Sequence, residues 1–143
     1  MIMELESNLN KILALNKNEH YEKYIDSLPT KRLKALENNI KRKGIEDTDL
    51  KLRFSEAVLY TNIVDKKDML KSSFEDIHSQ LDFRDSSELD LFFDKLYELR
   101  NSIAHGSPIL GVFKYNTLEF HEFIINLDKV ITEINNINRT YEI

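Results

Sequence analysis

The chain has 143 residues, of which 41% are hydrophobic and 31% charged, with three Gly, two Pro and no Cys. This length suits one domain with a packed core, and the scarcity of Gly and Pro favours long helices over a strand-and-turn fold. The lack of Cys excludes disulfides and thiolate metal sites, and the net charge of −5 argues against a generic nucleic-acid binder driven by overall charge.

Apolar residues recur at intervals of three and four along most of the chain, and no segment shows the period-two alternation of a strand. The expected fold class is therefore all-α, a bundle of about five to seven helices. A single domain is expected over residues 1–143, with 1–29 as a possible N-terminal helical extension. Helices are expected over residues 2–16, 19–27, 31–43, 49–65, 67–81, 88–105 and 117–138.

The start of the chain has no hydrophobic run that resembles a signal peptide. No stretch approaches the roughly 18 consecutive apolar residues that a membrane-spanning helix needs. We therefore expect a cytoplasmic protein that has no membrane partner.

A basic strip lies at the end of the first third of the chain. Residues 31–53 carry eight Lys or Arg against four Asp or Glu, and the last turn of the 31–43 helix holds Lys41, Arg42 and Lys43. Such a strip is either a set of solvated helix faces or a surface that meets a polyanion.

The 49–65 helix is apolar on most sides and is expected to be central. Its apolar stretch "FSEAVLY" contains one acid, Glu56. Glu56 either lies at the surface or orients a functional cation across the bundle.

The last two helices have recognisable starts. Ser87 with Asp90 forms a possible capping box for the 88–105 helix, and Asn116 with Glu119 opens the 117–138 helix.

The 88–105 helix carries two neighbouring stripes, and Arg100 lies in the second of them. At about 100° per residue, Arg100 falls roughly 40° from Leu96. A buried, unpaired guanidinium is very costly, so Arg100 must face an acidic partner, extend to water, or point into a polar cleft shared with another subunit. The core stripe is Leu89, Phe92, Leu96, Leu99 and Ile103, and the flanking stripe is Phe93, Tyr97, Arg100 and Ala104.

The end of the same helix concentrates polar groups. Asn101 and His105 are four residues apart and share a face, whereas His105 lies roughly 140° from Arg100 on an ideal helix. Because Gly106 and Pro108 follow, the last turn could deviate and let His105 swing toward Arg100. The alternative is that both residues have structural roles only, with His105 as a C-terminal helix cap and Arg100 in an ordinary salt bridge.

The string "LRNSIAHG", with Arg100, Asn101 and His105 in the order R-N-x-x-x-H, resembles the signature of the HEPN superfamily (higher eukaryotes and prokaryotes nucleotide-binding). Active members carry R-x(4–6)-H at the end of a helix, often with Asn directly after the Arg. The motif also has the family's context, late in a helical chain and before a loop and one long helix. The resemblance covers roughly residues 30–138.

The resemblance implies metal-independent RNA cleavage by a homodimer whose two motifs line one cleft. It makes Arg100, Asn101 and His105 the catalytic candidates and gives the basic strip an RNA-binding role. Histidine exchanges protons near neutral pH, and a guanidinium matches the charge of the transition state. Neither a cofactor nor a metal is expected, because the four His are scattered and form no ligand pair.

The resemblance further implies a toxin or phage-defence role, with a cognate antitoxin or regulatory protein as a possible partner. Ser107 stands where the toxins silenced by nucleotidylation carry a Tyr, so that control is not expected here. Two alternatives remain: a catalytically inactive HEPN-like module that binds a protein or nucleotide, and a helical adaptor unrelated to HEPN proteins.

Overall fold

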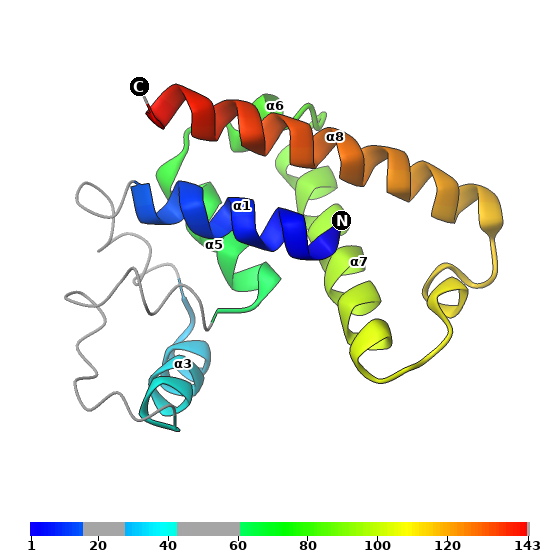
Figure 1. Ribbon diagram of the computed structural model, residues 1–143, viewed down its shortest axis with the longest axis horizontal. Coiled ribbons are helices and arrows are strands. Elements are labelled where there is room, and N and C mark those ends of the chain that lie inside the picture. Colours follow the sequence, from blue (N-terminus) through cyan, green and yellow to red (C-terminus); the bar gives the residue numbers. More distant parts are fainter. Residues whose placement is uncertain (16–27, 43–60, 143) are drawn as a thin grey trace. The chain divides into compact units, whose positions relative to one another are not determined.

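The structure, a computed structural model, describes residues 1–15, 28–42 and 61–142. These residues form six α-helices and one 3-10 helix and contain no strand, which confirms the predicted all-α fold. None of the described helices is long and apolar enough to cross a membrane. The elements are α1 (Ile2–Leu15), α3 (Thr30–Arg42), α5 (Ile63–Ser73), α6 (Ile77–Gln80), α7 (Ser86–Ala104), the 3-10 helix η2 (Ile109–Phe113) and α8 (Thr117–Glu142), as labelled in Figure 1.

The chain divides into two compact units. The first unit comprises Met1–Asn8 and His78–Ile143, and the second comprises Leu9–Ile77. Helix α1 thus gives its first turns to the first unit and its remainder to the second.

The second unit joins α3 to α5 through an ion pair. Arg32 donates from Nε and Nη2 to the two carboxylate oxygens of Asp65, at 3.1 and 2.8 Å. Asp65 is buried, and a two-pronged pair of this kind fixes orientation as well as charge. The core around it is apolar and includes Ile12, Leu13, Leu36, Ile63, Met69 and Leu70.

The limits of the helices expected around residue 65 were wrong. Asn62 caps a new helix, because its side chain accepts from the backbone N of Asp65 while the Asp65 carboxylate accepts from the backbone N of Asn62. The expected 49–65 helix therefore does not run through Asn62. Its earlier part, and the whole expected 19–27 helix, lie outside the described residues. The expected 67–81 helix is also interrupted, since Phe74 is extended and Asp76 has a φ of 54°.

In the first unit, phenylalanine packing holds α7, η2 and α8 together. The rings of Phe92 on α7 and Phe123 on α8 stack with centroids 5.0 Å apart, and Phe113 of η2 lies 5.3 Å from Phe123. All three are buried. Because these rings tie η2 to both long helices, the segment between α7 and α8 has a defined place although the sequence predicted only a loop there.

The cap predicted for α7 was wrong, and the cap predicted for α8 is confirmed. Helix α7 begins two residues earlier than expected, because Asp85 is the cap and accepts from the backbone N of Glu88 at 2.9 Å, in place of the predicted Ser87 box. Helix α8 begins as predicted, since Asn116 Oδ1 accepts from the backbone N of Leu118 and Glu119, both at 3.1 Å. It continues to Glu142, four residues beyond the predicted end.

Candidate functional site

Arg100 lies on the surface of α7 and has an acidic partner. Its side chain is 48% exposed, and its Nε donates to Oε1 of Glu6, whose side chain is 21% exposed. Glu6 belongs to the first turns of α1, 94 positions away in the sequence and in the same compact unit. Of the three environments predicted for Arg100, the acidic partner is the one observed. The sequence allowed an acidic partner as one of three environments but carried no signal that selected Glu6 among 25 acidic residues.

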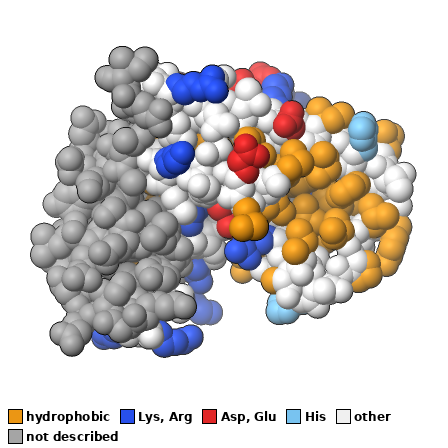
Figure 2. All heavy atoms as spheres, viewed as in Figure 1, with side chains coloured by type: hydrophobic (Ala, Val, Ile, Leu, Met, Phe, Trp, Pro, Cys, Tyr) orange, Lys and Arg blue, Asp and Glu red, His pale blue; other side chains and the backbone are white. Residues whose placement is uncertain are grey.

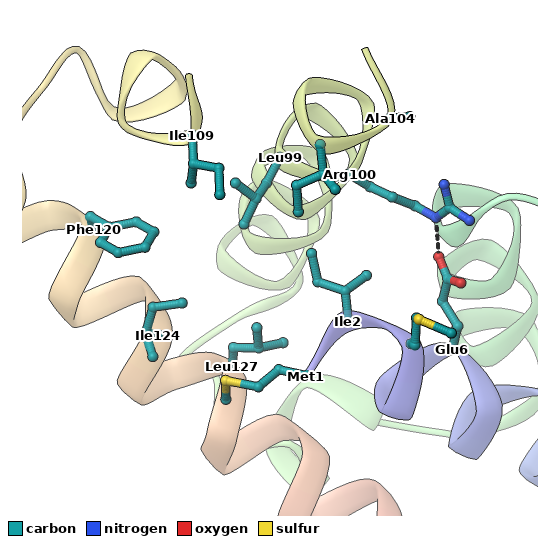
Figure 3. A pocket seen from close by; sticks show the side chains of 12 residues that line it. Met1, Ile2, Glu6, Leu99, Arg100, Ala104, Ile109, Phe120, Ile124 and Leu127 are labelled. Carbon is teal, nitrogen blue, oxygen red and sulfur yellow. Dashed lines mark hydrogen bonds and ion pairs between the residues drawn. The ribbon is translucent and has the colours of Figure 1, made fainter. Parts of the chain in front are cut away.

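The ion pair lies at an apolar pocket of about 490 Å³ (Figure 3). Four elements of the first unit line it: the start of α1, the end of α7, η2 and the first half of α8. Arg100 and Glu6 are the two charged residues of this lining, and Figure 3 shows the dashed contact between them beside the apolar side chains. The remaining lining residues are Met1, Ile2, Met3, Leu99, Ile103, Ala104, Ile109, Phe120, Ile124 and Leu127.

The pocket opens onto an apolar surface. Figure 2 shows hydrophobic side chains gathered over the end of α7, η2 and the start of α8. Ile103, predicted to be core, is 52% exposed and lies on this surface, because the core of the first unit ends one turn before α7 does. Contiguous exposed apolar surface of this kind is typical of interaction sites.

The flanking stripe of α7 divides between core and surface. Phe93 is fully buried, so the apolar core of this helix is wider than one stripe. Tyr97, Arg100 and Ala104 are exposed. The flanking stripe is therefore not continuous in its burial. Its first member, Phe93, lies in the core, and its other three members are exposed.

His105 is the C-terminal cap of α7 and is exposed. Its backbone N donates to the Asn101 carbonyl at 3.0 Å, which keeps His105 in helical register. Gly106 follows with a φ of +69°, and the backbone N atoms of Gly106 and Ser107 donate to the carbonyls of Ile103 and Ser102. This is a Schellman ending, which needs a left-handed residue at the position of Gly106.

Arg100 and His105 are therefore not brought together within one chain. Because the helix stays regular to Ala104, the separation of roughly 140° persists, and the swing of His105 toward Arg100 does not occur. Arg100 lines the pocket, whereas His105 does not. Asn101 is half-buried, and its side chain has no hydrogen bond within the described part of the chain.

The other predicted site residues lie elsewhere. Lys41 and Arg42 are exposed at the end of α3, in the second unit rather than in the unit that holds Arg100. Lys43 and Glu56 lie outside the described residues. The carboxylate that meets Arg100 is that of Glu6, so the orienting role considered for Glu56 has another candidate.

Over residues 1–15, 28–42 and 61–142, no group of three or more His, Asp or Glu could hold a metal ion. Comparisons of the chain with models of known protein families, with characterised proteins and with solved structures gave no match. The resemblance to HEPN proteins therefore rests on the Arg100–His105 motif and its position in a helical chain.

Proposed function

We propose that the chain is a metal-independent endoribonuclease of HEPN type that acts through Arg100, Asn101 and His105. The observation that supports this most strongly is that the side chains of Arg100 and His105 are both exposed at the end of α7. The core uses neither of them, since both are exposed, and within the described residues the guanidinium is anchored at Nε alone. Arg100 lies at a surface pocket and His105 at the exposed end of the same helix, so both side chains are accessible to a substrate.

The proposed reaction needs an acid, a base and a cation. A base takes the proton of the RNA 2′-hydroxyl, whose oxygen then attacks the adjacent phosphorus. The bond to the 5′-oxygen breaks, and that oxygen receives a proton. The products are a 2′,3′-cyclic phosphate and a 5′-hydroxyl. Histidine suits the proton transfers, and the Arg100 guanidinium stabilises the crowded, negatively charged phosphorus centre.

The active form is proposed to be a homodimer. Within one chain Arg100 and His105 diverge, so a complete site needs the two copies of the motif around one cleft. A second copy could bury the apolar surface beside Arg100, where Ile103 and Ile109 are exposed. A two-fold interface would bring the two motifs close because it uses the same surface on both subunits.

The test incubates purified protein with total RNA and EDTA. Wild type should cleave, and His105→Ala should lose about 10²–10⁴-fold in rate, as expected for loss of an acid–base group. His121→Ala is the matched control, because His121 is exposed on α8 and does not line the pocket that holds Arg100. Equal cleavage by wild type and His105→Ala would rule out His105. The proposed toxin or defence role predicts that expression of the wild type, but not of His105→Ala, slows growth.

A second candidate function is a catalytically inactive HEPN-like binding module. The ion pair favours it, because the Glu6 carboxylate offsets the charge of Arg100 that a phosphate would meet. This candidate predicts no RNA cleavage by the wild type and a protein or nucleotide ligand that engages the same surface.

A further inference from the structure

Glu6 fixes one edge of the Arg100 guanidinium. Its Oε1 accepts from Nε, and over the part of the chain that the structure describes no other group binds Arg100. A guanidinium has five N–H donors in a rigid fork. With Nε occupied, the edge formed by Nη1 and Nη2 stays available. Two parallel N–H donors on one edge match two oxygens of a phosphate.

The surroundings of Arg100 explain why it needs such an anchor. Most of the pocket lining is aliphatic and offers the guanidinium no other hydrogen-bond acceptor side chain. An unanchored arginine on such a wall extends toward water and samples many rotamers. A carboxylate on Nε removes that freedom.

The start of α1 lies at the pocket and is anchored by one core residue. Ile2 and Met3 line the same wall, and Leu5 is fully buried. Glu6 follows directly after this core residue, so its backbone is anchored, and its carboxylate meets Arg100. Glu4, two residues earlier and roughly 200° around the helix, is exposed and lies outside the lining.

We propose that Glu6 is a positioning residue of the ribonuclease site, which holds Arg100 by Nε so that its Nη1–Nη2 edge receives the scissile phosphate. This inference rests on the proposed function. It gives α1, which lies outside the segment that resembles HEPN proteins, an indirect part in the chemistry, through the placement of Arg100.

The proposal predicts opposite effects on binding and turnover. Loss of the carboxylate makes the site more positive by one charge, so KM for RNA should stay unchanged or fall. Loss of the anchor misplaces Arg100, so kcat should fall about 10–100-fold, the range expected for small displacements of a reacting group. A residue that only supported folding would lower stability and would not separate kcat from KM in this way.

The experiment measures kcat and KM on a single-stranded RNA with EDTA for wild type, Glu6→Ala, Glu6→Gln and the control Glu4→Ala. Glu6→Gln keeps the side-chain length and an acceptor oxygen, so it should retain more activity than Glu6→Ala. The ¹⁵N signal of Arg100 Nε–H, assigned with Arg100→Lys, should show slower hydrogen exchange in the wild type than in Glu6→Ala.

The outcomes separate this inference from the proposed function. If the wild type cleaves and Glu6→Ala behaves like Glu4→Ala in both constants, the inference is wrong and the ribonuclease stands. A higher KM and a lower melting temperature in both Glu6 variants would show a structural role and also overturn it. If wild type and His105→Ala are equally inactive, the proposed function fails, and the inference fails with it.

Discussion

Truncation of Ile103 should weaken the proposed dimer without unfolding the monomer. Fully burying an Ile side chain stabilises by about 1.5–3 kcal/mol. Ile103 is 52% exposed, so a second copy could bury about half of it, or about 1 kcal/mol per subunit. A two-fold interface contains the residue twice, which gives about 2 kcal/mol in total. Ile103→Ala should therefore raise the dimer Kd roughly 30-fold.

Sedimentation velocity over a concentration series measures this Kd. Ile125→Ala is the matched control, because Ile125 is 54% exposed on α8 but does not line the pocket. Its Kd should equal that of the wild type, and the melting temperatures of both variants should change little. A wild type that remains monomeric at tens of micromolar, roughly the range of modest interfaces, would refute the reasoning. So would equal weakening by both variants, since the effect would then not belong to the pocket surface.

Phe123→Ala should destabilise the fold by about 3–5 kcal/mol in chemical denaturation, because it removes a buried ring that packs against Phe92; a loss under about 1 kcal/mol would contradict the packing. Asp85→Ala should cost about 1 kcal/mol as the loss of a helix cap, whereas Ser87→Ala should change stability by only a few tenths; the reverse order would restore the capping box read from the sequence. Charge reversal across Lys41–Lys43 should weaken RNA binding and reduce its salt dependence in a fluorescence titration; unchanged affinity and slope would leave the segment a solvated helix end.

The start of α8 could be read from the sequence at Asn116. Asn116 directly precedes a long apolar stripe, and the cap was predicted correctly. The segment "DSSELD" offers three possible caps in a row, and local pattern cannot rank Asp85 above Ser87. The interruption at Asn62 was missed for a related reason, since apolar residues on both sides of it made one long helix look continuous.

Burial along α7 was predictable only in part. Periodicity identifies which residues share a face, so Leu89, Leu96 and Leu99 were correctly assigned to the core. It cannot show where neighbouring elements stop covering that face, and Ile103 continues the period beyond the end of the core. Phe93 was placed on the flank although the surrounding elements bury it completely.

The candidate site was also predictable only in part: its residues on α7 could be identified from local sequence, but their partner could not. The sequence identified Arg100 as a cation that needs an acidic partner, water or a shared polar cleft, because its place beside an apolar stripe is a local property. The partner, Glu6, comes from the opposite end of the chain, and only the tertiary fold selects it. The separation of Arg100 and His105 depends on the Schellman ending, which holds His105 in helical register.

The chemistry of the cleaved ends tests the central claim most directly. A defined single-stranded RNA would be incubated with wild-type protein and EDTA, with Arg100→Ala as the inactive comparison, and the fragments identified by mass spectrometry. Attack by the 2′-hydroxyl predicts a 2′,3′-cyclic phosphate on the upstream fragment, a 5′-hydroxyl on the downstream fragment, and loss of both with Arg100→Ala. Fragments ending in a 3′-hydroxyl and a 5′-phosphate, or cleavage that persists in Arg100→Ala, would contradict the proposed mechanism.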